Sequence, residues 1–322
     1  MLRICNVQKE ETMIYTLTVN PSLDYMIKLE SLTLGAMQRT KDEKLIYGGK
    51  GINVSLMLKE LGLDSIAYGF IGGETAQMYE AGVQAMGLQT AFLPVKNGFT
   101  RINIKINAEE ETEINGQGTQ PDQEELTKMI ECLSSLGQGD ILILSGSVQK
   151  SIPPTFYAQL MQVVSANGAL CVVDTNGESL LHAIKEKPFL IKTNIHELEE
   201  VFQCPMKEGI LFSSMQALQQ KGVKNVLVSC GGDGAYLLDE QGAIYYGKSA
   251  HGIVVSTIGC GDSMTAGFLY GWLQHGNYKE AFRMGLAAGS ASAFTYGIAK
   301  GEEVKRLADQ IEIEILRESD KK

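Results

Sequence analysis

The stretch Thr257-Ile-Gly-Cys-Gly-Asp262-Ser-Met-Thr-Ala-Gly267 carries the strongest signal in the chain. Its glycines lead straight into an amphipathic segment with Phe268 and Trp272, which predicts a helix that begins near Gly261. Glycine allows unusual backbone dihedrals, and the free N–H groups and positive dipole end of a helix can hold an anion. Asp262 in this field is either a helix cap or a base placed to accept a proton from an attacking hydroxyl.

Upstream of this stretch, strand and helix signals alternate along the chain. Strands are expected at 14–20, 65–71, 89–95, 140–145, 169–174, 188–193, 224–230, 234–239 and 243–247. Helices are expected at 52–61, 74–86, 122–135, 154–167 and 178–186, and further ones begin near 278 and 302. This rhythm predicts one α/β domain over 13–322, with a mostly parallel central sheet and helices on both faces.

Two segments interrupt the alternation. Residues 24–47 show little helical period, and residues 99–115 read as a β-hairpin. We expect these two insertions to pair into a small sheet that forms a lid over the main domain. Residues 1–12 are polar and precede a second methionine, Met13, so they are expected to be a leader: a tag, an alternative start or a disordered arm.

The composition excludes several classes of protein. The chain has 322 residues, of which 44% are hydrophobic and 20% charged, as in ordinary globular proteins. Its formal net charge of -10 gives no basic field to attract nucleic acid or an anionic membrane surface. The six cysteines contain no CxxC pair, which indicates neither a zinc site nor a disulfide framework. The chain also lacks an apolar run of roughly 20 residues, so a cytoplasmic protein is expected.

A second glycine-rich run, Tyr47-Gly48-Gly49-Lys50-Gly51-Ile52-Asn53-Val54, precedes the first expected helix. It is either a glycine turn or a place where backbone and the Asn53 amide meet the hydroxyls of a ligand. It does not match the GxxxxGK[ST] pattern of a Walker A loop. Asp24 lies just past the first strand, at the end where α/β folds bind ligands, and is either a turn residue or a clamp for two hydroxyls.

These runs resemble the signatures of the ribokinase-like (PfkB) carbohydrate kinases. The stretch 257–267 is similar to the family's GAGD signature, with Cys260 where Ala is usual, and 47–54 is similar to its N-terminal signature. The run Lys192-Thr-Asn194-Ile-His-Glu197 resembles the family's KPNxxE pattern, with Thr193 in place of Pro. Ser229 to Ala235 resembles the SLGxxGA turn, and Gly285 to Ser292 resembles the helix that flanks the adenine. The runs occur in family order from about residue 14 to 315.

The resemblance implies a ribokinase-like three-layer fold, an ATP-dependent sugar kinase activity and a requirement for Mg²⁺. In such an enzyme Asp262 would be the catalytic base, and the backbone of Gly259, Cys260 and Gly261 would form the anion hole. The implied sugar contacts are Asp24, Gly48, Gly49, Lys50 and Asn53. The implied nucleotide contacts are Lys192, Asn194, Ser229, Gly231, Gly234, Gly289 and Ser292. Asn194 and Glu197 would act on magnesium, usually through water, as oxygen ligands suited to this ion. The alternative for this run is an N-capped helix with an exposed Glu197.

The acceptor is implied by the run Thr18-Val-Asn-Pro-Ser-Leu-Asp24, which resembles the hexose-phosphate branch of the family. Arg39 lies in the first insertion, and Arg101 and Asn103 lie in the second. A guanidinium binds phosphate in a bidentate way, and by resemblance such arginines hold the phosphate already on the sugar; otherwise they are solvated strand charges. Fructose 1-phosphate is narrowly favoured over tagatose 6-phosphate, with a free-sugar or nucleoside kinase as the next alternative.

The sequence is less consistent with two other classes of function. A Rossmann dehydrogenase is disfavoured, because no GxGxxG follows the first strand with an acidic residue about 20 positions later. A silent sugar-binding sensor would have lost the base, so Asp262 argues against it. The resemblance also implies a homodimer, since the lid sheet of this family often pairs between subunits. Finally, Cys260 at a helix N-terminus is expected to have a lowered pKa and to be reactive, unless it is buried and inert.

Overall fold

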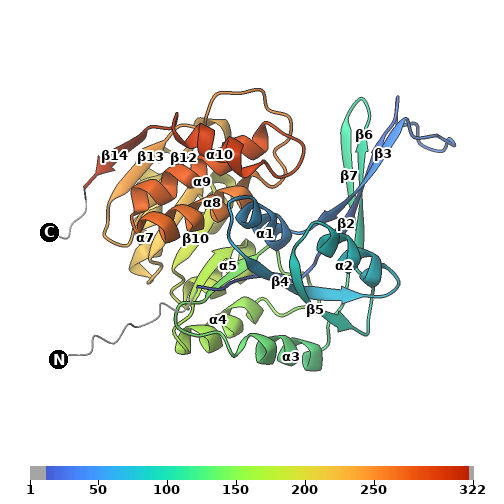
Figure 1. Cartoon of the computed structure of the whole chain (residues 1–322), viewed down its shortest axis with the longest axis horizontal. Coiled ribbons are helices and arrows are strands. Elements are labelled where there is room, and N and C mark those ends of the chain that lie inside the picture. The colour runs from blue at the N-terminus through green and yellow to red at the C-terminus, as the bar shows by residue number, and fades with distance from the viewer. Residues whose placement is uncertain (1–11, 319–322) are drawn as a thin grey trace, which may run out of the picture.

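The computed structural model describes residues 12–318 (Figure 1). The leader expected at 1–12 therefore lies, except for its last residue, outside the described part of the chain. No helix within 12–318 combines the length and the apolar character that crossing a bilayer requires.

A ten-stranded sheet runs through the described part of the chain. Its strands are β1 (Ile14–Thr18), β4 (Ser65–Gly72), β5 (Gln89–Val95), β8 (Ile141–Ser145), β9 (Leu170–Asp174), β10 (Leu190–Asn194), β11 (Asn225–Ser229), β12 (Ala235–Leu238), β13 (Ile244–Gly247) and β14 (Ile313–Arg317). They are ordered β14-β13-β12-β11-β10-β9-β8-β1-β4-β5. Neighbours from β11 to β5 pair in parallel, whereas β12, β13 and β14 pair antiparallel. The predicted mostly parallel sheet is confirmed.

Helices cover both faces of this sheet (Figure 1). One face carries α1 (Lys50–Glu60), α2 (Thr75–Ala85), α8 (Cys260–His275), α9 (Tyr278–Ala293) and α10 (Gly301–Ala308). The other carries α3 (Gln123–Leu133), α4 (Phe156–Ala166), α5 (Gly177–Ile184), α6 (Ile195–Phe202) and α7 (Glu208–Gln220). The alternation of side chains along a strand explains the two cores, because Ile141 and Ile143 of β8 enter one and Leu142 and Leu144 enter the other. The three-layer expectation is correct.

A separate small sheet projects from the body at the carboxyl end of β1 (Figure 1). Its strands β2 (Ser22–Lys28), β3 (Asp42–Gly48), β6 (Arg101–Asn107) and β7 (Glu111–Asn115) follow the order β3-β2-β6-β7. The expected hairpin is present as β6 and β7, and β2 joins the two insertions by pairing with both β3 and β6. The register places Ser22, Gly48 and Arg101 at the end of the small sheet next to the body.

Candidate active site

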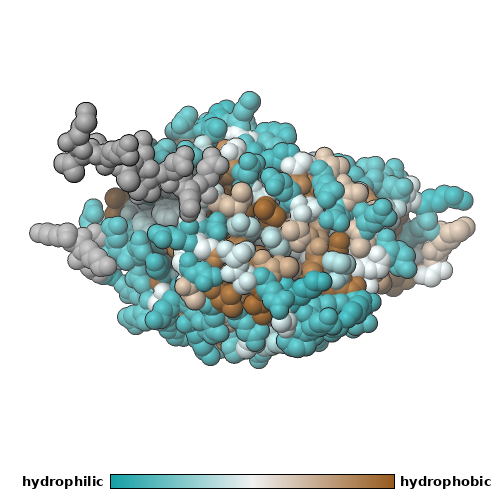
Figure 2. All heavy atoms as spheres, turned by 60° about the horizontal axis from the view of Figure 1, so that its bottom comes forward, coloured by the Kyte–Doolittle hydropathy of each residue, from teal (hydrophilic) through white to brown (hydrophobic). Residues whose placement is uncertain are grey.

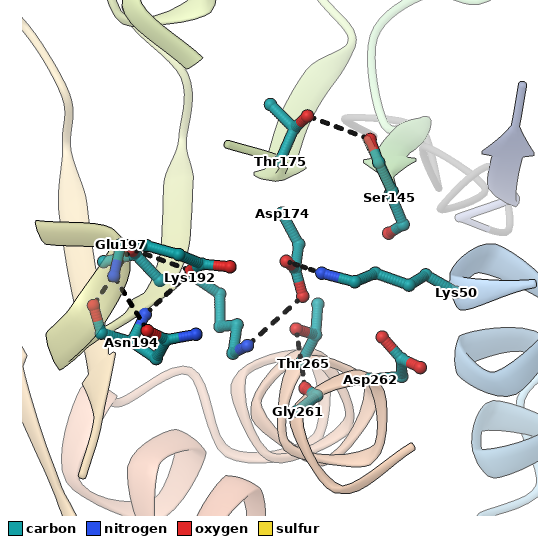
Figure 3. A network of polar contacts seen from close by, with 12 residues as sticks. Lys50, Ser145, Asp174, Thr175, Lys192, Asn194, Glu197, Gly261, Asp262 and Thr265 are labelled. Atoms are coloured by element: carbon teal, nitrogen blue, oxygen red, sulfur yellow. Dashed lines mark hydrogen bonds and ion pairs between the residues drawn. The ribbon is translucent and has the colours of Figure 1, made fainter. Parts of the chain in front are cut away.

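A cluster of charged side chains lies where the carboxyl ends of the central parallel strands meet two helix N-termini (Figure 3). Asp174 ends β9 and Lys192 lies in β10, while Lys50 is the first residue of α1 and Asp262 lies in the first turn of α8. Parallel strands end at the same edge of a sheet, which is where α/β folds bind their ligands. The fold thus gathers residues that lie far apart in the sequence, from Lys50 to Asp262.

Asp262 is buried, with 5% of its surface exposed, and its Oδ2 accepts a hydrogen bond of 2.8 Å from Asn53 Nδ2. Burial raises the pKa of this carboxyl to about 6, and the charge of Asp174 adds to the effect, against the opposing influence of Lys50, Asn53 and Lys192. Gly259, not Asp262, is the N-cap of α8, and the described hydrogen bond of the Asp262 side chain goes to Asn53 rather than to a helix amide. The structure therefore gives Asp262 no capping bond, and its role as a base stays a prediction.

The glycines before Asp262 are required by geometry. Gly259, the N-cap of α8, has φ 78°, a left-handed conformation that favours glycine. A Cβ on Gly261 would lie 2.5 Å from Lys192 Nζ, so this ammonium group passes directly over the glycine turn. The positive end of α8 and the Lys192 charge together make the turn a place where a negatively charged group is stabilised.

Asp174 is a functional candidate that the sequence analysis missed. It is 1% exposed, and its Oδ1 and Oδ2 lie 2.9 Å from Lys50 Nζ and 3.4 Å from Lys192 Nζ. Burial alone would raise its pKa, but Lys192 and Lys50 outweigh burial and hold the pKa below the ordinary value. The available signal was an aspartate that closes the apolar strand Leu170–Asp174 at its carboxyl end.

Cys260 differs from the expectation. Although it is the first residue of α8, burial raises the pKa of its thiol to about 11, with a further contribution from the Asp262 charge. The expected low pKa is wrong, because loss of hydration and a nearby carboxylate outweigh the helix dipole at this position.

We therefore predict slow alkylation of Cys260. A thiol with a pKa near 11 forms far less thiolate at neutral pH than one with the ordinary value of about 8.5. Iodoacetamide should label Cys260 roughly 100-fold more slowly than the exposed Cys132, as followed by mass spectrometry of tryptic peptides. Equal labelling rates at the two residues would show that the Cys260 thiol is activated after all.

Asp24 and Asn103 meet at the base of the small sheet. Asp24 Oδ1 accepts hydrogen bonds of 2.8 Å from Asn103 Nδ2 and from Ser22 Oγ. Asp24 lies within β2, so it is not a turn residue, and a Cβ on Gly48 would lie 2.9 Å from its Oδ2. Backbone thus comes close to a fixed carboxylate, as the expected sugar contact requires.

Arg101 is half-buried and unpaired. Its Nε is buried without a partner, and its guanidinium makes no hydrogen bond or ion pair with any other residue in 12–318. Burial lowers its pKa, while the nearby Asp24 and Tyr79 oppose that change. A half-buried guanidinium without a hydrogen-bond partner has lost part of its hydration, so this position is suited to an anionic ligand.

Arg39 lies elsewhere. It is exposed in the connection between β2 and β3, beyond the pair Lys28 and Asp42 at the free end of the small sheet. Six residue steps of about 3.3 Å separate that end from Ser22, a distance of about 20 Å. The structure does not bring Arg39 to the site within one subunit. This corrects the expectation that Arg39 and Arg101 of one chain hold the same sugar phosphate.

The run that contains Asn194 and Glu197 forms the start of α6. Asn194 Oδ1 accepts a hydrogen bond of 2.9 Å from the Glu197 amide, and Glu197 Oε2 accepts one of 3.0 Å from the Asn194 amide. This capping box fixes both side chains. Thr193, which replaces the usual Pro, donates from its hydroxyl to Glu197 at 3.1 Å and so adds to the order of this turn. In the described chain no three His, Cys, Asp or Glu residues are arranged to hold a metal.

The remaining nucleotide candidates divide into two groups. Ser229 pairs in register with Asn194, and Gly231 and Gly234 follow it in the turn before β12, with φ values of 60° and 102°. This turn adjoins the charged cluster.

Gly289 and Ser292 lie instead inside the contact between α8 and α9. A Cβ on Gly289 would lie 3.2 Å from the Cys260 carbonyl, and Ser292 Oγ, fully buried, is 2.8 Å from Ser263 Oγ. Both residues thus take part in helix packing, and their contact with a nucleotide stays a prediction.

The site contains a buried carboxylate with a raised pKa, next to a helix N-terminus and two ammonium groups. Such a carboxylate can accept the proton of a hydroxyl, and the positive groups can stabilise the charge of a phosphoryl group during its transfer. The pfkB family carbohydrate kinase pattern matches residues 18–305. The chain is 40% identical over 304 residues to a 1-phosphofructokinase of Bacillus subtilis, covering 94% of this chain and 99% of that protein. It is 34% identical over 303 residues to a D-tagatose-1-phosphate kinase of Bacillus licheniformis, with the same coverage of 94% and 99%.

The structure of phosphofructokinase-2 from Escherichia coli in complex with fructose-6-phosphate has the same fold. It matches with a TM-score of 0.86 and 25% identity, over 93% of this chain and 99% of that chain. The chain belongs to the pfkB family of carbohydrate kinases. The expected ribokinase-like fold and sugar kinase class are confirmed, with ATP as the phosphoryl donor that the sugar kinases of this family use.

Proposed function

We propose that this enzyme transfers the γ-phosphoryl group of ATP to fructose 1-phosphate, giving fructose 1,6-bisphosphate and ADP. The observation that carries the proposal is Arg101, a half-buried guanidinium without a partner beside the fixed carboxylate of Asp24. An acceptor that already bears a phosphate would supply the missing anion. The likeness to the 1-phosphofructokinase of Bacillus subtilis favours fructose 1-phosphate, and tagatose phosphates are the alternative that the D-tagatose-1-phosphate kinase supports.

In the proposed reaction Asp262 accepts the proton of the acceptor hydroxyl while that oxygen bonds to the γ-phosphorus. The bond from the γ-phosphorus to the bridging oxygen breaks, and ADP leaves. Asn53 holds the carboxylate in place through its 2.8 Å hydrogen bond. The amides at 259–261 and the Lys192 ammonium stabilise the charge that spreads over the transferring group.

The polar turn at the start of α6 suits a magnesium ion held mainly by water and phosphate. Glu197 Oε2 is used by the capping box, whereas its Oε1 has no partner among the described residues. Asn194 likewise keeps its amide nitrogen free of bonds within 12–318. Mg²⁺ bound with ATP supplies neutralisation of the phosphate charge, and these two residues would hold it through water.

The small sheet is proposed to act as a lid and as the contact of a homodimer. Asp24, Arg101 and Asn103 share the face of the sheet toward the site, and the opposite face exposes Leu45 (38%), Ile102 (39%) and Ile114 (55%). Figure 2 shows hydrophobic residues reaching the surface toward the end of the molecule where the small sheet projects. Apolar strand faces of this kind are buried in stable assemblies.

The same proposal includes one kinase domain over 13–322 and a cytoplasmic location, where the free described cysteines would stay reduced.

The pH dependence of the reaction follows from Asp262. The base must be ionised to accept a proton, and its pKa of about 6 means that it is protonated below that pH. We expect kcat/KM to fall roughly tenfold per pH unit below pH 6 and to level off above it. Initial rates in buffers of constant ionic strength measure this, and an acid limb near pH 4, the ordinary range of a carboxyl, would contradict the assignment.

The proposed function is tested by measuring ADP release with a panel of acceptors. The panel contains fructose 1-phosphate, fructose 6-phosphate, tagatose 1-phosphate, tagatose 6-phosphate and free fructose. We expect the highest kcat/KM with fructose 1-phosphate, and at least about tenfold less with free fructose, since about 1.4 kcal/mol corresponds to tenfold. A preference for the free sugar or for a nucleoside would overturn the proposal.

A further inference from the structure

The two lysines of the charged cluster are held by a single carboxylate. Figure 3 shows Lys50 and Lys192 reaching Asp174 from opposite sides, with Asp262 nearby in α8. Their Nζ atoms lie 2.9 Å and 3.4 Å from the two carboxylate oxygens. Asp174 is 1% exposed and the side chain of Lys192 is 6% exposed, so neither group is at the solvated surface.

Each lysine also faces the expected path of the phosphoryl group. Lys192 Nζ lies 2.5 Å from the place of a Cβ on Gly261, which puts it over the positive turn of α8. Lys50 comes from the first turn of α1, and the charge of Asp262 acts on its ammonium group. Its side chain is 39% exposed, so it faces the open side of the cluster.

We propose that Asp174 is a positioning residue that holds Lys50 and Lys192 on either side of the transferring phosphoryl group, and that Lys50 binds this group rather than the sugar. This inference rests on the proposed kinase reaction. Asp174 keeps the two ammonium groups in place before ATP arrives, so little reorganisation is needed when the phosphoryl charge spreads. Lys50 forms an ion pair with Asp174 in the charged cluster. Asp24, the proposed sugar contact, bonds instead to Ser22 and Asn103 in the small sheet.

The charges of the cluster support this division of roles. Two carboxylates, Asp174 and Asp262, face two ammonium groups, Lys50 and Lys192, and Glu197 adds an attraction on Lys50 from the start of α6. The cluster of four is neutral. A bound phosphoryl group adds negative charge, which among these four groups only the two lysines can balance. Removal of Asp174 would take away the carboxylate with which both lysines pair.

The test is a double-mutant cycle of Asp174→Asn and Lys50→Met with fructose 1-phosphate and ATP. Each single variant should lower kcat by about 100-fold, the scale for loss of one preorganised charge stabiliser, with the acceptor KM within about threefold. Both changes break the same Lys50–Asp174 ion pair, so their effects should not add. The kcat of the double variant should be at most about threefold below that of the slower single variant. Independent losses that multiply would overturn the proposal.

The pH dependence of kcat/KM distinguishes a positioning role of Asp174 from a general loss of stability. Asp174→Asn should move the acid limb of kcat/KM below pH 6, because the Asp174 charge contributes to the raised pKa of Asp262. The matched control is Asp239→Asn, an equally buried carboxylate (1% exposed) in the turn before β13, bonded to Tyr245 and to the amides of Gln241 and Ala243. The control should lower thermal stability and leave the acid limb in place.

If Asp174→Asn fails to fold, Lys50→Met and Lys50→Arg decide the question alone. A rise in the acceptor KM with unchanged kcat would make Lys50 a sugar contact and contradict the proposal, whereas a loss of kcat that Lys50→Arg partly restores would support it. Failure of fructose 1-phosphate as acceptor would count against the proposed function only, because the cycle can be run with whichever panel sugar is phosphorylated.

Discussion

Replacement of Asp262 by Asn is expected to lower kcat by roughly 10²- to 10⁴-fold, the scale of general acid–base catalysis. The amide has nearly the shape of the carboxylate but cannot accept the proton of the acceptor hydroxyl. The Asn side chain can still bond to Asn53, and the change removes the charge interactions with Asp174, Lys50 and Lys192, one of them repulsive. Folding should therefore be retained. Steady-state kinetics with saturating ATP and sugar measure the loss.

Binding provides the control for this prediction. Calorimetric titration with ATP and with the acceptor should give dissociation constants within about threefold of those of the parent enzyme, because the base acts chiefly in the transition state. Near-normal turnover in the purified variant would remove Asp262 from the mechanism. A loss of binding equal to the loss of turnover would assign it to substrate binding.

Replacement of Arg101 by Ala is expected to lower kcat/KM for a phosphohexose by roughly 10- to 100-fold. A guanidinium that pairs with phosphate makes charge-assisted hydrogen bonds worth ~1.5–3 kcal/mol, and about 1.4 kcal/mol corresponds to tenfold. Activity on the unphosphorylated hexose should change little, because that substrate has no phosphate to lose. The KM for ATP should also stay the same.

Arg39 supplies the matched control for Arg101. Because it is exposed at the free end of the small sheet, Arg39→Ala should leave kcat/KM for both substrates within about twofold, as surface substitutions usually do. Equal losses on both substrates in Arg101→Ala would indicate a folding defect of the small sheet. No loss on the phosphohexose would favour a free-sugar or nucleoside kinase.

Most of the fold could be predicted because local signals agreed with the global arrangement. The apolar strands expected at 65–71 and 89–95 are separated by a helix expected at 74–86, and such a helical crossover makes neighbouring strands parallel, as β4 and β5 are. An N-capped helix was one of the two interpretations of the run that contains Asn194 and Glu197, and α6 confirms that such a helix is present. Helix α7 was missed because the side chain of its N-cap residue, Lys207, does not cap its start and Gly209 lies in its first turn. Strand β14 was missed because it lies at the sheet edge, and most of its side chains are exposed.

Those residues of the candidate site could be predicted that stand inside a recognisable sequence motif. Asp262 and Asn53 are marked by glycines beside them, and the structure joins the two by a hydrogen bond. Asp174 has no such mark, because its role depends on two lysines that only the tertiary fold brings to it. Cys260 shows the opposite failure: its place at a helix N-terminus was correctly expected, but burial and the Asp262 charge reverse the sign of its pKa shift.

The most direct test of the account is to identify the product of the reaction. The purified enzyme is incubated with MgATP and fructose 1-phosphate as the sole acceptor, and the mixture is followed by ³¹P nuclear magnetic resonance. The account predicts a sugar carrying phosphate at both ends, formed mole for mole with ADP, and no such product from Asp262→Asn over the same period. ADP released together with inorganic phosphate, and no bisphosphate, would contradict it.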